Sequence, residues 1–170
     1  MVTLKNFIDL DDWQKREIWQ WRNSQQVSCY MKNKVISWEE HLEFIEGLKN
    51  DSTKLYFLVF LNQEAIGVID FVDLKRGDSC EFGLYQNPCL KGYGARLMEI
   101  LMEYALKELA IKNLYACAFN ENIKAINLYL KFGFILTKKD EIMSYFKYYL
   151  GGGGLNNSFI SFPILQRRAS

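Results

Sequence analysis

A glycine-containing turn between a predicted strand and a predicted helix is the first stretch whose residue types could do chemistry. Residues 80–85 form a short apolar run typical of a strand, and turn-forming residues follow at 87–88. Gly92 and Gly94 then precede an amphipathic stretch that predicts a helix over about 95–109. Such a turn presents backbone N–H groups at the positive end of a helix, so it can cradle a phosphate. A tight turn without a ligand is the alternative, because two glycines alone are a weak motif.

Two side chains in the N-terminal half have the chemistry of a general base. Asp70 lies inside the predicted strand 65–72, where a carboxylate is costly unless it is used or paired. The strand face that it shares is expected to be otherwise aliphatic: Ile66, Val68 and Val72. His41 is the only histidine, and its ordinary pKa suits proton transfer near neutral pH. The alternatives are a carboxylate satisfied at a strand end and a histidine that only packs.

The elements that must position these groups alternate between strands and helices over residues 1–150. We expect strands near residues 2–7, 55–61, 65–72, 80–85, 114–119, 135–137 and 143–150. We expect helices near residues 12–23, 38–48 and 95–109, and a last one that ends at Gly133. Residues 25–31 are expected to be less regular. Ser37 and Glu40 have capping-box spacing, and Glu103 and Lys107 are expected to form an i, i+4 pair on a solvent-facing side.

Composition restricts the class of protein. A chain of 170 residues with 49% hydrophobic and 15% aromatic residues suits one packed domain. The net charge of +1, without a basic run, argues against a nucleic-acid partner. We find no bilayer-spanning stretch and no signal-peptide pattern, so we expect a cytoplasmic protein without a membrane partner.

The cysteines and the C-terminal end add two expectations. The four cysteines form no C-x-x-C pair, and three of them are interpreted as reduced packing residues in apolar or strand-like surroundings. No metal-ligand cluster is found, so no metal is expected. Four consecutive glycines begin the segment 151–170, which we interpret as a flexible appendage to the domain of residues 1–150.

The second half of the chain resembles the GNAT superfamily of N-acetyltransferases. Residues 122–134 contain an Asn followed by Ala-Ile-x-Leu-Tyr-x-Lys-x-Gly-Phe, which is similar to the acetyl-CoA-binding half of that family. The loop with Gly92 and Gly94 is similar to the family's pyrophosphate loop, Gln/Arg-x-x-Gly-x-Gly/Ala. One departure is Cys89, which stands where the family usually has Gln or Arg. Because the cradle consists of backbone N–H groups, this change should weaken coenzyme binding without abolishing it.

This resemblance implies an α/β (α+β) fold, the GNAT fold, with a mixed, mostly antiparallel central sheet, a splayed strand pair and flanking helices. Acetyl-CoA would lie between the splayed strands. The implied coenzyme contacts are on the predicted strand 80–85, on the glycine loop and before the last helix: Phe82, Leu84, Tyr85, Lys91, Gly92, Tyr93, Gly94, Ala95 and Asn122.

The reaction that the resemblance implies is direct attack of an amine on the thioester in a ternary complex. Tyr129 matches the family position of the general acid, since a phenol pKa of about 10 and a thiol pKa of about 8.5 are close. A free backbone N–H near Leu84 or Tyr85 would stabilise the oxyanion. Glu81, beside the gap, joins Asp70 and His41 as a candidate base, and no single one is selected. A core aromatic is the alternative for Tyr129, and a solvated edge charge is the alternative for Glu81.

A narrower resemblance covers residues 1–150. Segments such as 21–23 (Trp-Arg-Asn), 40–45 and 80–85 are similar to the pseudaminic acid pathway N-acetyltransferases. That subfamily acetylates the 4-amino group of UDP-4-amino-4,6-dideoxy-N-acetyl-β-L-altrosamine for flagellin glycosylation. The resemblance implies a UDP-amino-sugar acceptor bound by Arg22, Tyr30, Met31, Lys32 and Phe44. Residues 24–25 are Ser-Gln, where His-Pro is common, so a related amino-sugar nucleotide stays open.

Two other functions remain as alternatives. A ribosomal-protein N-terminal acetyltransferase shares the Trp-Arg-Asn feature and would use a peptide α-amine. A non-catalytic acetyl-CoA-binding module would not need Tyr129 or a base. A nicotinamide-binding fold is disfavoured because the glycine turn comes late and lacks the acidic partner residue. The sequence leaves the assembly open, with a homodimer as one option.

Overall fold

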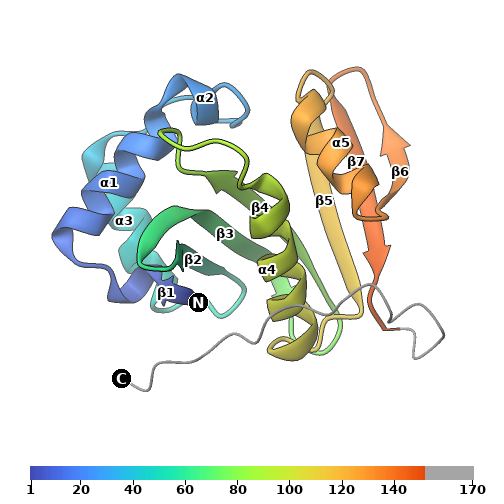
Figure 1. Ribbon diagram of the computed structural model, residues 1–170, viewed down its shortest axis with the longest axis horizontal. Coiled ribbons are helices and arrows are strands. Elements are labelled where there is room, and N and C mark those ends of the chain that lie inside the picture. The colour runs from blue at the N-terminus through green and yellow to red at the C-terminus, as the bar shows by residue number, and fades with distance from the viewer. Residues whose placement is uncertain (152–170) are drawn as a thin grey trace.

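The computed structural model describes residues 1–151, and these form one sheet with helices on both faces (Figure 1). The strands are β1 (Val2–Asn6), β2 (Leu55–Leu61), β3 (Glu64–Lys75), β4 (Ser79–Gln86), β5 (Asn113–Phe119), β6 (Ile135–Lys139) and β7 (Met143–Tyr149). The helices are η1 (Phe7–Asp9, a 3-10 turn), α1 (Asp12–Asn23), α2 (Gln25–Ser28), α3 (Trp38–Leu48), α4 (Gly94–Lys107) and α5 (Ile123–Lys131). The predicted fold class is confirmed. The expected appendage, apart from Gly151, lies outside the described residues.

The sheet has the order β1-β2-β3-β4-β5-β7-β6, and β4–β5 is its parallel pair among antiparallel neighbours. β4 and β5 are in register only from Ser79–Asn113 to Glu81–Tyr115. Beyond this point the two strands diverge, as Figure 1 shows. Because backbone N–H and C=O groups need partners, the diverging part of β4 is suited to hold an extended ligand. The expected splayed pair is therefore present.

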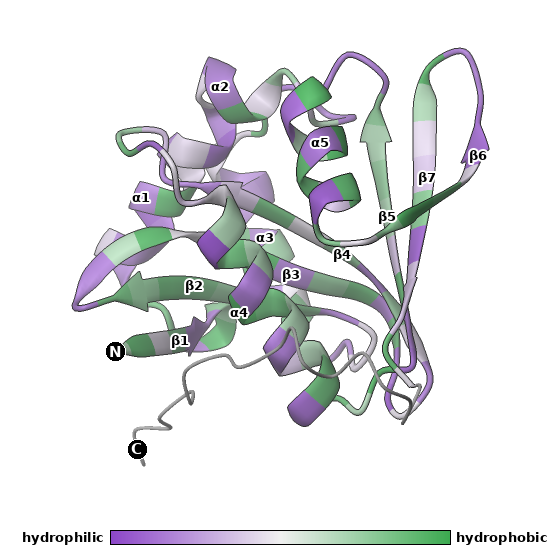
Figure 2. Ribbon diagram, turned by 45° about the vertical axis from the view of Figure 1, so that its right-hand side comes forward, coloured by the Kyte–Doolittle hydropathy of each residue, from purple (hydrophilic) through white to green (hydrophobic). Residues whose placement is uncertain are grey.

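Helices α4 and α5 cover one face of the sheet, and α1 and α3 cover the other (Figure 2). On the α4 side a large core includes Phe71, Phe82, Leu97, Leu101 and Phe146. On the α1/α3 side a smaller core includes Ile18, Trp21, Ile45, Leu58 and Val68. The central strands are thus buried on both faces, which explains the almost continuous apolar run of β2.

Two capping boxes start the helices that cover the α1/α3 side. Ser37 Oγ accepts from the Glu40 N–H at 3.1 Å, while the Ser37 N–H donates to Glu40 Oε2 at 2.7 Å. Asp11 and Gln14 form the same reciprocal pair before α1, at 2.8 and 3.1 Å. These local bonds satisfy N–H groups that a helix start leaves unpaired, so the expected start of α3 is confirmed.

A β-bulge corrects the expected face of Ile66. Ala65 pairs with Phe60, and Gly67 pairs with Val59, so Ile66 is an extra residue on β3. The extra residue reverses the alternation, and Ile66 packs into the α4-side core. Asp70 therefore shares its face with Val68 and Val72, but not with Ile66.

Two further expectations need adjustment. Residues 25–31, expected to be less regular, contain the short helix α2. Glu103 was expected to face water, but its side chain is only 3% exposed, and it forms its ion pair with Lys107 at 2.9 Å. The other predicted elements are present, with ends shifted by a few residues, as is usual at frayed termini.

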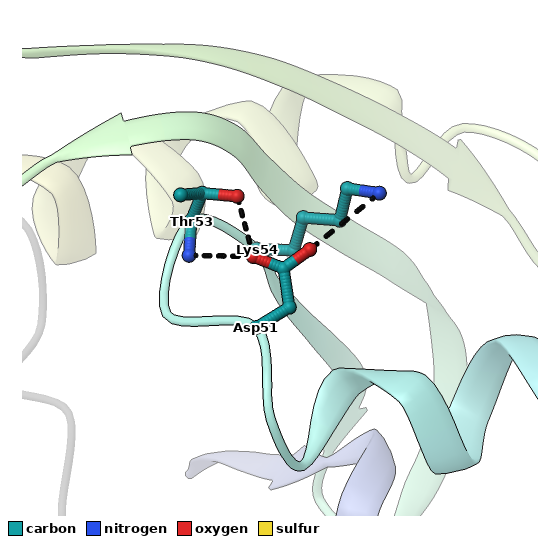
Figure 3. Close-up of polar contacts among 3 residues, drawn as sticks. All are labelled: Asp51, Thr53 and Lys54. Atoms are coloured by element: carbon teal, nitrogen blue, oxygen red, sulfur yellow. Dashed lines mark hydrogen bonds and ion pairs between the residues drawn. The ribbon is translucent and has the colours of Figure 1, made fainter.

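The connection between α3 and β2 is held by Asp51 (Figure 3). Its Oδ1 accepts from the Thr53 backbone N–H at 2.9 Å and from the Thr53 hydroxyl, and its Oδ2 lies 3.7 Å from Lys54 Nζ. These bonds, that of the Thr53 hydroxyl above all, lower the pKa of Asp51. The Thr53 carbonyl also accepts from the Leu74 N–H at 3.0 Å, so this turn helps to set the register of β2 against β3.

Candidate active site

The glycine loop between β4 and α4 is braced by two polar side chains. Asn87 Oδ1 accepts from the Cys89 N–H at 2.9 Å, and Asn87 Nδ2 donates to the Ala65 carbonyl at 3.0 Å. Gln86 Oε1 accepts from the Tyr93 N–H at 3.1 Å, and Gln86 Nε2 donates to the Leu90 carbonyl at 3.2 Å. The bracing role of Gln86 was missed by the sequence reasoning, although its place at the end of a strand before the loop could have indicated it.

The start of α4 has the properties of an anion site. Tyr93 is the N-cap residue, and its side chain makes no capping hydrogen bond. The first N–H groups of a helix have no partner within the helix, and here no side chain of the N-cap takes that place. Gly92 has φ = +82°, a conformation that glycine adopts without strain. Lys91 is exposed beside it, which adds a cation. The loop can therefore hold a phosphate group, as its sequence pattern predicts.

The hydrogen-bond alternation along β4 identifies which N–H points into the gap, that is, the space between β4 and β5 beyond their last register pair. The Asn87 N–H donates to the Ile66 carbonyl on β3 at 2.8 Å. The β3–β4 register runs without a shift from Gly67–Gln86 to Val72–Glu81. Successive N–H groups of a strand point to opposite sides, so the Leu84 N–H points toward β5. Of the two candidate oxyanion donors, Leu84 and Tyr85, Leu84 thus has the suitable direction.

The side chains of β4 alternate between the two faces of the sheet. Cys80 and Phe82 are buried in the α4-side core, and Leu84 packs against it. Tyr85 packs against the α1/α3-side core. Glu81 and Gly83 share the face of Tyr85, which places them on the side opposite α4.

Asp70 on β3 lies directly opposite Gly83, its register partner on β4. A Cβ atom at Gly83 would stand 2.6 Å from Asp70 Oδ2, so glycine is needed there to leave room for the carboxyl group. Burial raises the pKa of Asp70 to about 7, the charge of Glu81 adds to this rise, and a hydrogen bond from the Gly83 backbone opposes it. The carboxyl group can therefore gain or lose a proton near neutral pH, as a general base must.

Glu81 is joined to β5 by a cysteine that the sequence reasoning did not select. Cys117 Sγ lies 3.0 Å from Glu81 Oε1. Burial raises the pKa of the Cys117 thiol to about 12, and the hydrogen bond to Glu81 adds to the rise, so the thiol keeps its proton and donates it. Three of the four cysteines were interpreted as packing residues, but only Cys80 is buried, and Cys29 and Cys89 are exposed. The strand β5 alternates, and Cys117 is on the opposite face from the buried Leu114, Ala116 and Ala118. This alternation could have identified it.

Tyr129 faces the same gap from α5. It is 6% exposed, and its ring packs on Phe82 and Phe146 at centroid distances of 5.4 Å each. Burial raises the pKa of Tyr129, and nearby Cys117, Asp70 and Glu81 raise it further. The phenol therefore stays protonated and lies within the electrostatic reach of both carboxyl groups. The two interpretations of Tyr129, a packed aromatic and a proton donor, are compatible.

Tyr56 and Tyr85 pack against the α1/α3-side core, near Asp70. Burial raises the pKa of both phenols, and the charge of Asp70 is the next cause in each case. Phe44 contacts Tyr56 edge-on at 4.9 Å, so it supports the wall of the site from α3. Tyr56 was not selected from the sequence, because its role depends on the cross-strand position opposite Asp70.

Arg22 connects this wall to the segment after α2. Its Nη1 donates to the Lys34 carbonyl at 3.1 Å and its Nη2 to the Asn33 carbonyl at 2.6 Å. Burial lowers the pKa of Arg22, and the neighbouring phenols Tyr85 and Tyr56 oppose this effect. Arg22 thus fixes the backbone of residues 33–34 next to the site.

The other residues expected to bind the acceptor lie along the same segment. Tyr30 and Lys32 are exposed, and Met31 is partly buried. Lys32 is close enough to the gap to lower the pKa of the Cys117 thiol, although burial prevails there. Lys34 Nζ lies 5.6 Å from the Phe119 ring centroid on β5. The segment therefore approaches the opening between the splayed strands.

His41 and Asn122 have local partners. His41 is 2% exposed, and its Nε2 lies 2.8 Å from the Lys15 carbonyl, so this nitrogen carries the proton and donates it. Burial lowers the pKa of His41, and its ring joins α3 to α1. Asn122 Oδ1 accepts from the Ala125 N–H at 3.2 Å and caps α5.

The splayed β4–β5 pair, the glycine loop and the facing tyrosine define an acyltransferase site of the GNAT type. The sequence matches the acetyltransferase (GNAT) domain family over residues 2–135, and the chain belongs to this family. It is an N-acetyltransferase.

Within this family, the chain is similar to acetyltransferase PseH of Campylobacter jejuni. It is 45% identical to PseH of serotype O:2 over 145 residues, which cover 85% of this chain and 92% of the relative. It is 44% identical to PseH of serotype O:23/36 over 141 residues, which cover 83% and 89%.

Solved structures show the same relationship. The crystal structure of C. jejuni N-acetyltransferase PseH in complex with acetyl coenzyme A matches with a TM-score of 0.77 and 38% identity, covering 88% of this chain and 99% of that one. A spermidine N-acetyltransferase from Vibrio cholerae in complex with CoA and spermine has a TM-score of 0.76 at 20% identity, covering 87% and 95%, and shares the fold alone.

Two features are absent from residues 1–151. In this part of the chain, no helix combines the length and apolar character needed to cross a membrane. In the same part, His, Cys, Asp and Glu side chains form no group of three or more that could hold a metal ion.

Proposed function

We propose that this N-acetyltransferase transfers the acetyl group of acetyl-CoA to the 4-amino group of UDP-4-amino-4,6-dideoxy-N-acetyl-β-L-altrosamine, in the pseudaminic acid pathway for flagellin glycosylation. Similarity to PseH along most of both chains supports this acceptor, as does the crystal complex of PseH with acetyl coenzyme A. The observation that carries the proposal is the carboxyl group of Asp70 packed against Gly83 of β4, two residues beyond Glu81, where the pairing of β4 with β5 ends.

The coenzyme is proposed to follow β4 and the loop. The backbone of residues 82–85 binds the pantetheine part in place of a neighbouring strand, since this part of β4 has no register partner on β5. The pyrophosphate lies on the N–H groups of residues 91–95, at the uncapped start of α4. Asn122 uses its side-chain oxygen to cap α5, so its amide nitrogen is the group that would reach the coenzyme.

The acceptor is proposed to lie between α1, α3 and the segment of residues 30–34. Arg22 and Lys32 supply positive charge for the diphosphate, and Tyr30 and Met31 supply apolar surface for the uracil or the sugar. Phe44 contributes through its contact with Tyr56. His41 is proposed to hold α3 against α1 through its bond to the Lys15 carbonyl, which leaves the base to the two carboxyl groups.

The reaction follows from the groups around the gap. The acceptor ammonium loses a proton to the Asp70–Glu81 pair, and the neutral amine attacks the thioester carbonyl. The Leu84 N–H donates to the oxyanion of the tetrahedral intermediate. When the C–S bond breaks, the CoA sulfur receives the proton of the Tyr129 phenol. Bulk solvent then exchanges protons with the tyrosine and the carboxyl pair.

The test is CoA release from acetyl-CoA by the full chain with three acceptors in parallel. We expect turnover with the UDP-4-amino-4,6-dideoxy sugar, and none above background with spermidine or with a ribosomal-protein N-terminal peptide. Turnover with the peptide alone would replace the proposed acceptor by a protein. Tight binding of acetyl-CoA without turnover on any acceptor would favour a non-catalytic coenzyme-binding module.

We further propose a cytoplasmic enzyme with its domain in residues 1–150, without a nucleic-acid or membrane partner. The cytoplasm is proposed because both substrates, acetyl-CoA and a nucleotide sugar, are present there. Its assembly stays open between a monomer and a homodimer. Light scattering checks the assembly, because a dimer has twice the chain mass of 20.0 kDa. A mass of one chain at micromolar concentration would reject the homodimer.

A further inference from the structure

A side-chain hydrogen bond joins the splayed strands just beyond the point where their backbone pairing ends. The last register pair of β4 and β5 is Glu81–Tyr115. Two residues farther along β5, Cys117 Sγ lies 3.0 Å from Glu81 Oε1. The bond therefore spans the opening at its narrow end, next to the proposed site of acetyl transfer.

The thiol is the donor of this bond. Burial, and then the bond to Glu81 and its charge, raise the pKa of Cys117 to about 12, while Lys32 acts in the opposite direction. A thiolate beside a carboxylate would also bring two like charges together. Cys117 is therefore a neutral hydrogen-bond donor here, and a poor nucleophile.

The bond restricts the orientation of the Glu81 carboxyl group. A carboxylate attached by a flexible side chain has several rotamers, and a donor that holds Oε1 selects among them. The other groups that act on this region are Asp70 from β3, Tyr56 from β2, Tyr85 from β4, Tyr129 from α5 and Lys32 from the segment after α2. With Oε1 held toward β5, Oε2 is the oxygen that receives a proton from the acceptor.

We propose that Cys117 is a positioning residue for acetyl transfer: its S–H holds the Glu81 carboxylate in the orientation that takes the proton of the acceptor ammonium. This inference rests on the proposed function. In the step itself, the N–H bond of the ammonium breaks, an O–H bond forms on Glu81, and the freed electron pair of the nitrogen attacks the thioester carbonyl. Cys117 keeps its own proton and forms no covalent bond.

The test is a double-mutant cycle on the full chain, with Cys117→Ala, Glu81→Gln and the combination of both. We expect Cys117→Ala to lower kcat/KM for the amino sugar by roughly 10- to 100-fold, as expected for a lost hydrogen bond to a charged group. The KM for acetyl-CoA should stay within about twofold. In the Glu81→Gln background, Cys117→Ala should have no further effect, because the group it positions is no longer a base.

Two variants separate positioning from packing. Cys117→Ser keeps a donor of similar length, so it should recover most of the kcat/KM that Cys117→Ala loses. Cys117→Val fills a similar volume but has no donor, so it should remain as impaired as Cys117→Ala. Thermal unfolding of every variant shows whether it remains folded.

The following results would overturn the inference. These are a fully additive cycle, a serine variant as impaired as the alanine variant while still folded, and an acetylated Cys117 detected by mass spectrometry after incubation with acetyl-CoA. If the wild type acetylates the amino sugar and Cys117→Ala is equally active, the inference is also rejected, while the proposed function stays intact. A wild type without turnover on the amino sugar would reject the proposed function, and this inference with it.

Discussion

The raised pKa of Asp70 makes the stability of the protein depend on pH in a way that Asp70→Asn should remove. The folded pKa is about 7, above the ordinary value of 3.8, because of burial first and the charge of Glu81 second. Between these two values, the folded state keeps a proton on Asp70 that the unfolded chain has lost. The stabilisation is therefore fully present below about pH 4 and is lost as the pH rises to about 7.

The magnitude follows from the difference between the two pKa values. A shift from 3.8 to about 7 is about 3 units, and each unit is worth about 1.4 kcal/mol. Asp70 thus reduces the free energy of unfolding by up to about 4 kcal/mol between pH 4 and pH 7. This is an upper value, since Asp70 keeps some exposed surface. Asparagine has nearly the same size and does not titrate. The free energy of unfolding of Asp70→Asn therefore lacks this dependence on pH.

The assay is urea unfolding at several pH values from 4.5 to 8, followed by tryptophan fluorescence. As the pH rises over this range, we expect the free energy of unfolding of Asp70→Asn to increase relative to that of the wild type by roughly 2–4 kcal/mol. Asp73→Asn is a matched control on the same strand, because Asp73 is exposed and has φ = +49°, which asparagine also adopts. A difference in the free energy of unfolding between wild type and Asp70→Asn that stays constant at all pH values would refute the reasoning.

Three further predictions concern the site. Tyr129→Phe should lower kcat by at least about 100-fold with an unchanged KM for acetyl-CoA, as steady-state kinetics would show, because the thiolate loses its proton donor; a change of less than threefold would exclude Tyr129 as the acid. Gly92→Ala should weaken CoA binding in calorimetry about tenfold, since φ = +82° strains alanine and distorts the cradle; unchanged binding would show that this loop conformation is not needed. Arg22→Lys should raise the KM for the amino sugar several-fold and leave that for acetyl-CoA unchanged, because lysine cannot make both bonds to the carbonyls of residues 33–34; an effect on acetyl-CoA alone would contradict the assignment of Arg22 to the acceptor side.

Local patterns predicted most of the architecture. The capping box at Ser37 and Glu40 depends on residues three apart, so the start of α3 could be identified from the sequence. The glycine loop was predictable for the same reason, since a strand, a turn and a helix are adjacent in the chain. The splayed pair of strands was expected only from the resemblance to a family, because no local pattern shows where two strands separate.

The site residues that escaped prediction depend on contacts between distant segments. Cys117 and Glu81 are 36 positions apart, and only the packing of β5 beside β4 brings them together. Tyr56 joins the site because it lies opposite Asp70 on the neighbouring strand. Ile66 was placed on the wrong face because a bulge depends on the partner strand as much as on its own residues. The depth of His41 was also not apparent, since helical periodicity places it only beside the buried stripe.

The measurement that tests the central claim most directly is initial-rate kinetics with both substrates varied, acetyl-CoA and the UDP-4-amino-4,6-dideoxy sugar. Direct attack in a ternary complex predicts double-reciprocal lines that intersect, with one CoA released for each acetylated sugar. Parallel lines would indicate an acetylated enzyme and contradict direct attack at the gap between β4 and β5. Absence of turnover, with acetyl-CoA bound, would contradict the assignment of the acceptor.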